Sequence, residues 1–329
     1  MSRLIRLAVS GVLLGLVAWR TDWAKFAQAF ASLKLEWWCA AAALYVVGQI
    51  FSTLRWQQMA RALGFEHSFR QMLGYYFIGM YFNLLLPTSV GGDFVRAWYL
   101  NGQSGRRLNA FLCVFLDRFS GLLVLLALAC LAVVLSPVTL EPWIVWSVYG
   151  MSASCLAGLA LLPTLARLAR LGDVRVLKIR AALGILKQPG LFARTTLLSF
   201  VVQSLGVLMV WLVGTALGAD VPASFYWILV PMVSLLTMLP VSVNGMGVRE
   251  VSMALLLAPM GAGKEVAVPL ALLWFAVTAL VSLTGGLVYL FGRFPRPQAN
   301  ANLAEELDDD GAIDHHPDQG RAGQSRAAA

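Results

Sequence analysis

Charged residues are scarce in this chain of 329 residues. Only 13% are Asp, Glu, Lys or Arg, whereas 59% are hydrophobic, and the mean hydropathy is +0.73. Soluble domains carry roughly 25% charged residues. The composition therefore excludes an ordinary soluble protein and indicates an integral membrane protein.

Histidine is also scarce, as are the sequence motifs of enzymes. The three histidines are His67, His315 and His316, and neither HExxH nor GxSxG occurs. The stretch GAGKE at residues 261–265 lacks the spacing and the Ser or Thr of a phosphate-binding loop. The four cysteines show no CxxC spacing, which argues against a zinc site. The sequence thus predicts no catalytic residue, no metal site and no cofactor.

Positive charge is present but unevenly distributed. The formal net charge is +8, yet residues 298–329 hold seven acidic residues and two arginines, a net charge of −5. The preceding part therefore carries about +13, and in a membrane protein such an excess marks cytoplasmic loops rather than a nucleic-acid surface. We expect a membrane domain over residues 1–296 and a disordered acidic cytoplasmic tail over residues 297–329.

Apolar runs of spanning length indicate the fold class, because a membrane helix needs about 17–25 apolar residues. We predict an all-α polytopic membrane protein with about six full transmembrane helices, over residues 7–19, 37–52, 110–136, 143–162, 197–217 and 266–291. The first run follows Arg3 and Arg6 and resembles either a cleaved signal peptide or an uncleaved signal anchor. Its distance from the cleavage-like AFAS at residues 29–32 favours the anchor.

Basic residues predict the orientation of these helices. Arg55, Arg61 and Arg70 follow the second run, and residues 164–194 hold seven Lys or Arg, so both connections are expected to be cytoplasmic. Residues 137–142 and 218–224 each hold a single acid and are expected outside. Both termini then lie on the cytoplasmic side of the membrane.

Two further apolar segments do not fit this charge pattern as full crossings. Residues 72–86 are followed by Pro87, which cannot continue a helix, and Gly91 and Gly92 permit a reversal of the chain. Residues 72–102 are therefore predicted to form a re-entrant hairpin. Residues 226–260 are predicted to form a second hairpin, whose turn contains Pro240, Asn244, Gly245 and Gly247. The alternative at both sites is an ordinary helix kinked at proline.

The two hairpins carry an internal repeat. LPTSVGGDFVR at residues 86–96 aligns without gaps to LPVSVNGMGVR at residues 239–249, with seven of eleven positions identical. The first repeat covers about residues 37–136 and the second about 195–292, and they begin on opposite sides of the membrane. Inverted repeats with broken helices are a known design of transporters.

The broken helices predict an anion-binding site. Each returning helix points its N-terminus, with its partial positive charge, toward the membrane centre, and Arg96 and Arg249 lie about one turn inside. The candidate substrate-binding residues are the polar and charged ones near these turns: Ser89, Asp93, Arg96, Asp117, Arg118, Ser242, Asn244, Arg249 and Glu250. The acids either bind substrate and couple protons, or pair with the arginines and lock the hairpins.

Three segments together resemble a known family. They are NLLLPTSVGGDFVRAWYL (83–100), LDRFSGLL (116–123) and LPVSVNGMGVREVSMALLL (239–257). They resemble the lysylphosphatidylglycerol synthase transmembrane region, also called the flippase-like UPF0104 family, and the flippase part of multiple peptide resistance factors. The resemblance covers about residues 4–293, adds Asn83 to the candidate residues, and implies an inner-membrane protein that handles anionic or polyprenyl-linked lipids. Aminoacyl-transferring relatives carry a further soluble catalytic domain, so lysyl-lipid synthesis is not expected of this chain alone.

These observations lead to three functional hypotheses. The first is a flippase or transporter for an anionic phospholipid or a polyprenyl-phosphate-linked lipid, with the headgroup between the hairpins near the bilayer midplane. The second is a non-catalytic membrane partner that presents such a lipid to a glycosyltransferase or lipid-modifying enzyme. The third is a transferase that acts through Asp93 and Asp117, but no nucleophile–base pair supports it.

Overall fold

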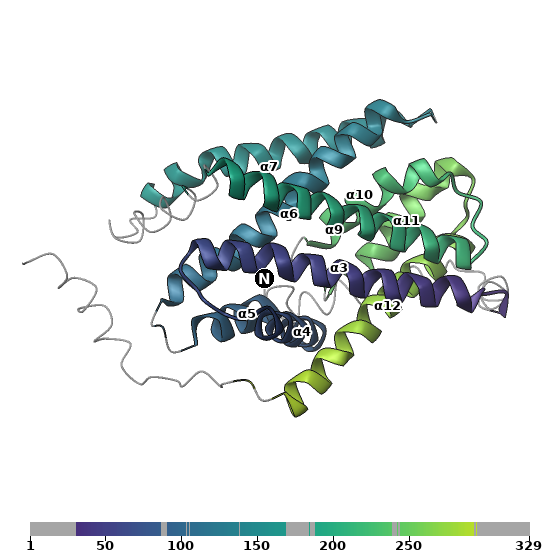
Figure 1. Ribbon diagram of the computed structural model, residues 1–329. Coiled ribbons are helices and arrows are strands. Elements are labelled where there is room, and N and C mark those ends of the chain that lie inside the picture. The colour runs from purple at the N-terminus through teal and green to yellow at the C-terminus, as the bar shows by residue number, and fades with distance from the viewer. Residues whose placement is uncertain are drawn as a thin grey trace, which may run out of the picture.

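The computed structural model describes residues 31–86, 91–102, 104, 106–137, 139–168, 184, 188–238, 242, 244–292 and 294. Within these ranges the regular structure is entirely helical, as predicted (Figure 1). Its elements are α3 (Leu35–Ala62), α4 (Phe69–Leu85), α5 (Gly91–Asn101), α6 (Arg107–Leu135), α7 (Pro142–Leu168), α9 (Pro189–Ala216), η1 (Ala223–Phe225), α10 (Tyr226–Met238), α11 (Val248–Leu257), η2 (Ala258–Met260) and α12 (Lys264–Phe291). The predictions for residues 7–19, the tail 297–329, Pro87, Ser89 and Pro240 fall outside the described residues.

Four of the described helices, α3, α6, α9 and α12, are long and apolar enough to cross a membrane. They contain the predicted spans 37–52, 110–136, 197–217 and 266–291 almost completely, and α7 contains 143–162. The chain is therefore a multi-pass membrane protein. One boundary was wrong: α3 continues to Ala62, so Arg55 lies inside a helix and is 5% exposed instead of lying in a cytoplasmic loop.

The two predicted hairpins are pairs of short helices. Helix α4 packs on α5, and α10 packs on α11. The returning helices have 11 and 10 residues, which at 1.5 Å per residue is about half of a hydrocarbon core of about 30 Å. The turn of the second hairpin contacts the first hairpin, because the side-chain amide of Asn244 donates to the backbone carbonyl of Leu84 over 3.0 Å.

The helices of the two repeats pack in matching pairs. The first helices, α3 and α9, run antiparallel: the Lys34 amide donates to the Ala216 carbonyl (2.9 Å), and the Arg55 side chain donates to the Ser199 hydroxyl (3.0 Å). Each hairpin packs on the last helix of the other repeat, α4 on α12 and α10 on α6. Each returning helix also packs on the last helix of its own repeat, α5 on α6 and α11 on α12. Each of these helix pairs thus has a counterpart in the other repeat.

Two apolar clusters hold the bundle together. The first contains the end of α3, most of α4 and α5, and the start of α6, with Trp56 and Tyr75 fully buried. The second contains the start of α3, the end of α9, both helices of the second hairpin and the start of α12, with Phe225 and Tyr226 fully buried. The starts of α6 and α12 consequently lie at opposite ends of α3.

This arrangement predicts the side on which two loops are accessible. Ser104 precedes α6 and Ala262 precedes α12, so single cysteines at these positions should react from opposite sides of the membrane. The measurement is labelling of Ser104→Cys and Ala262→Cys with a membrane-impermeant maleimide in intact cells and in inverted vesicles, with the four native cysteines replaced by alanine. Labelling of both positions from the same side would contradict the inverted arrangement.

Candidate functional site

A cavity of about 480 Å³ lies between the two repeats. Its walls come from the middle of each of the four long helices and from both hairpins. The lining residues include Tyr45, Gln49, Ser52 and Arg55 of α3, Asp117 and Arg118 of α6, Gln203 and Leu205 of α9, Trp274, Phe275 and Thr278 of α12, and Tyr76, Asn83, Arg96, Asn244 and Arg249 of the hairpins. The apolar clusters described above lie at the two ends of the same helices, so the cavity is at mid-height of the bundle.

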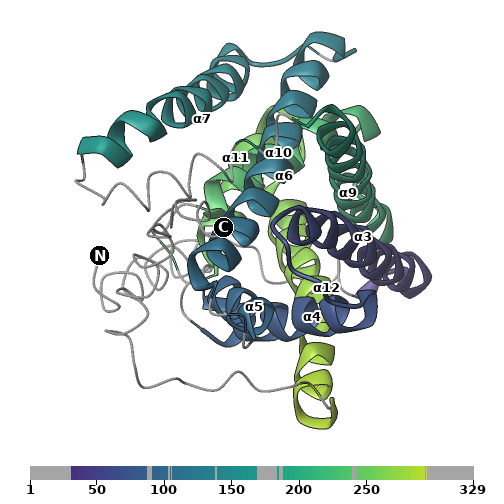
Figure 2. The ribbon, with the colours of Figure 1, turned by 60° about the vertical axis from the view of Figure 1, so that its left-hand side comes forward.

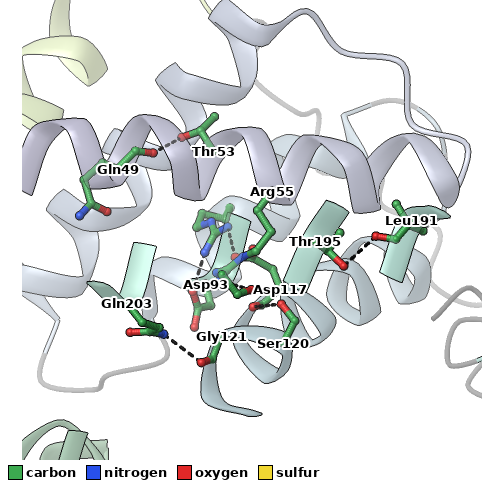
Figure 3. A network of polar contacts seen from close by, with 12 residues as sticks. Gln49, Thr53, Arg55, Asp93, Asp117, Ser120, Gly121, Leu191, Thr195 and Gln203 are labelled. Carbon is green, nitrogen blue, oxygen red and sulfur yellow. Dashed lines mark hydrogen bonds and ion pairs between the residues drawn. The ribbon is translucent and has the colours of Figure 1, made fainter. Parts of the chain in front are cut away.

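Asp117 is the centre of a buried ion-pair cluster in one wall (Figure 3). Its Oδ1 accepts from Arg55 Nε and its Oδ2 accepts from an Arg96 terminal nitrogen, both over 2.9 Å. Arg55 also donates to the Ser199 hydroxyl of α9 (3.0 Å). A carboxylate 1% exposed is stable only if it is paired, and here two charge-assisted bonds provide the pairing. The cluster joins α3, α5, α6 and α9.

Arg96, the arginine of the first repeat, is 3% exposed and firmly held. Its guanidinium lies between the rings of Trp56 and Tyr76, at 4.3 Å and 4.2 Å from their centroids. Besides Asp117 it contacts Asp93, one turn earlier on α5, over 3.5 Å. Cation–π contacts with two rings and ion pairs with two carboxylates leave this guanidinium with little freedom to move toward a substrate.

Arg118 completes the cluster at its more open side. It binds both oxygens of Asp93, over 2.8 Å and 3.0 Å, which is the bidentate geometry that arginine favours. Its side chain is nevertheless 41% exposed, against 14% for that of Asp93. The predicted neighbours Asp93, Arg96, Asp117 and Arg118 are therefore brought together, and the acids lie in ion pairs with the arginines.

Arg249, the arginine of the second repeat, has a different environment. Its guanidinium lies 5.3 Å from the ring centroids of both Trp274 and Phe275. It makes no ion pair with any residue that the structure describes. Its buried Nε has no hydrogen-bond partner there, which is also true of the Nε of Arg96. Trp274 and Phe275 are the eleventh and twelfth residues of α12, as Asp117 and Arg118 are of α6. The second repeat thus places aromatic residues where the first places the acid.

The charge of the cavity is consequently not balanced. Arg55, Arg96, Arg118 and Arg249 face it or adjoin it, against Asp117 and Asp93, which gives a formal net charge of +2. Glu250 does not line the cavity, but it is 3% exposed, adjacent to Arg249 and interacts with its charge, so counting it lowers the net charge to +1. Excess positive charge in a mostly apolar bundle is costly unless an anion compensates it.

The N-termini of the returning helices offer fewer free amide donors to an anion than predicted. The Gly92 amide donates to Asn83 Oδ1 and the Gly247 amide donates to Glu250 Oε2, each over 2.7 Å, so two of the free donors already have partners. Gly245 and Gly247 adopt φ of +74° and +82° in the second turn, a conformation that favours glycine. Ser242 is buried but does not line the cavity, whereas Asn244 does.

Several site residues were not singled out from the sequence. Arg55, Trp56, Tyr76, Gln203 and Trp274 all contact the arginines or line the cavity. One signal was available for α3, whose cavity-facing positions 45, 48, 49, 52 and 55 follow helical spacing and include Gln, Ser and Arg within an apolar run.

The model of the lysylphosphatidylglycerol synthase TM region family matches residues 3–286. The chain belongs to this family. The match confirms the resemblance carried by the hairpin motifs and by LDRFSGLL, and it associates the chain with membrane lipids. Comparisons with curated proteins and with solved structures found no match. Within the lysylphosphatidylglycerol synthase TM region, the charged cavity between the repeats is the candidate site.

The ion-pair cluster predicts a strong effect of Asp117→Asn on stability. The change leaves Arg55 and Arg96 buried without their carboxylate, and loss of one partner of a buried pair costs about 3–5 kcal/mol. We expect a clear fall in the melting temperature of the detergent-solubilised protein. Asp93→Asn, the control, should have a smaller effect because its main partner Arg118 is 41% exposed. Equal melting temperatures for the wild type and Asp117→Asn would contradict this role.

Proposed function

We propose that this protein is a flippase or transporter for lipids with an anionic headgroup, an anionic phospholipid or a polyprenyl-phosphate-linked lipid. The observation that carries the proposal is Arg249, a cation that lines the central cavity and has no ion-pair partner among the described residues. Membership of a lipid-related membrane family gives the class of ligand. The chain is proposed to bind and move the lipid and to catalyse no bond formation.

Electrostatics favours an anion at this place. The cavity carries an excess of positive charge in surroundings of low polarity, where charge pairs interact more strongly than in water. A phosphate group offers oxygens that match the planar fork of an arginine. Arg249 would bind the phosphate directly, and the exposed side of Arg118 lies along the same cavity wall.

The position of the cavity supports movement of a headgroup through the membrane interior. The lining residues lie at the middle of four helices that are long enough to span, which corresponds to the bilayer midplane. The short returning helices and the antiparallel α3–α9 pair support two re-entrant hairpins in inverted repeats, a design suited to alternating access. Both termini are proposed to be cytoplasmic, with the protein in the inner membrane.

The two hairpin arginines would have different roles. Arg96 is held between two rings and two carboxylates, so it fixes α5 to α3 and α6 and sets the potential of the cavity. Arg249 has its charge available for the lipid. Removal of Arg96 should therefore reduce folding as well as transport, whereas removal of Arg249 should reduce transport with the fold retained.

Reconstitution in liposomes with a fluorescently labelled anionic phospholipid tests this proposal. Arg249→Ala removes charge-assisted hydrogen bonds worth about 1.5–3 kcal/mol, so lipid movement should slow on the order of 10- to 100-fold. Arg249→Lys should retain part of the rate. Arg61→Ala is the matched control, because it removes one exposed positive charge outside the cavity and should leave the rate unchanged.

Two outcomes would count against this proposal. If Arg249→Ala moves the lipid as fast as wild type, the cavity does not bind the headgroup. If the wild-type protein retains an anionic lipid in native mass spectrometry, lost in Arg249→Ala, but never moves it, the protein presents the lipid to a partner enzyme instead.

A further inference from the structure

A second, apolar cleft lies beside the charged cavity, between α7 and the α10–α11 pair. Its volume is about 690 Å³. Its walls include Trp143, Gly150 and Met151 of α7, Met232 of α10 and Leu255 of α11. Figure 2 shows α7 at the edge of the bundle, joined to α6, and α7 packs mainly on that helix. The cleft is thus formed where a peripheral helix covers the second hairpin.

The chemistry of the cleft excludes a polar occupant. No charged side chain lines it. Among its serines, Ser147 and Ser154 donate their hydroxyl hydrogens to the carbonyls of Trp143 and Gly150, one turn earlier on the same helix. Their hydrogen-bonding capacity is therefore largely used within α7. The remaining walls offer methyl, methylene, thioether and ring surfaces to an occupant.

The cleft adjoins the charged cavity. Leu122 of α6 and Met238 at the end of α10 line both. On its other side the cleft reaches the surface, where Trp143, Met238 and Leu255 are 45%, 44% and 59% exposed. Leu122 and Met238 therefore stand between the arginine-lined cavity and a cleft that opens on the outer face of the bundle.

We infer that this cleft holds a hydrocarbon chain of the lipid whose headgroup lies in the charged cavity. The inference rests on the proposed function and extends it, because it gives the substrate an amphipathic shape and a lateral route between α7 and the second hairpin. A lipid is the occupant that matches both compartments at once, with an anion beside Arg249 and an apolar chain beyond Leu122. A water-soluble anion would occupy the charged cavity and leave the apolar cleft empty.

Two glycines of α7 give a matched test. Gly150 lines the cleft and Gly158 does not, and a Cβ added at either position meets no atom within 4 Å. Both can therefore be replaced by tryptophan without a clash at Cβ. Gly150→Trp fills the cleft and should slow movement of labelled anionic phospholipid about tenfold or more, as expected for an overfilled site. Gly158→Trp should move it at the wild-type rate.

A photo-crosslinking phospholipid with a diazirine in its acyl chain tests the location directly. With the wild type, crosslinked peptides should come from α7 and α10. Their yield should fall in Gly150→Trp, remain in Gly158→Trp, and fall in Arg249→Ala, because the chain in the cleft belongs to a headgroup held in the cavity. Bulk membrane lipid, or a partner protein that fills the cleft, would give yields that do not depend on Arg249.

The two proposals fail separately. If the wild type moves lipid and Gly150→Trp moves it equally fast, the cleft assignment is wrong and the flippase proposal stands. Equal slowing by Gly150→Trp and Gly158→Trp also overturns the assignment, because the effect is then not local to the cleft. If the wild type moves no lipid, transport fails, and the Arg249-dependent crosslink alone decides whether the cleft holds a chain.

Discussion

The Asp117 carboxylate is the interaction on which the arrangement of this bundle depends. A carboxylate 1% exposed among spanning helices must be neutralised, and Arg55 and Arg96 do so from two other helices. Arg55 extends the connection to α9 through Ser199. The first hairpin is thereby fixed to three long helices by charge, in surroundings where apolar packing alone gives little orientation because the lipid is equally apolar.

The two repeats place the same arginine in different surroundings. Arg96 meets a carboxylate at the eleventh position of α6, whereas Arg249 meets Trp274 at the eleventh position of α12. An aromatic face attracts a guanidinium without cancelling its charge. The motif is duplicated, but the surroundings of its arginine are not. Arg96 is paired with carboxylates of the protein, whereas Arg249 has no ion-pair partner among the described residues. This difference is the reason why the second hairpin, and not the first, is proposed to bind the headgroup.

Much of this could be predicted from the sequence, and the failures have identifiable causes. The long helices follow from uninterrupted apolar runs, and the ends of α4 and α10 lie beside the repeated proline motif. Arg55 was assigned to a loop because charge was taken as a sign of the membrane surface, while its partner Asp117 is 62 residues away. Arg96 and Arg249 were given equal roles, since only three-dimensional contacts with Trp56, Asp117 and Trp274 distinguish them.

The apolar clusters impose a condition on any lipid movement through the cavity. One cluster lies at the end of α3 and the other at its start, so a headgroup that moves along the bundle toward either end meets one of them. Helices α4 and α5 belong to the first cluster, while α10 and α11 belong to the second. Displacement of a single hairpin would therefore disrupt one cluster and leave the other intact. Because α10 also borders the apolar cleft, displacement of the second hairpin would alter the compartments for headgroup and chain together.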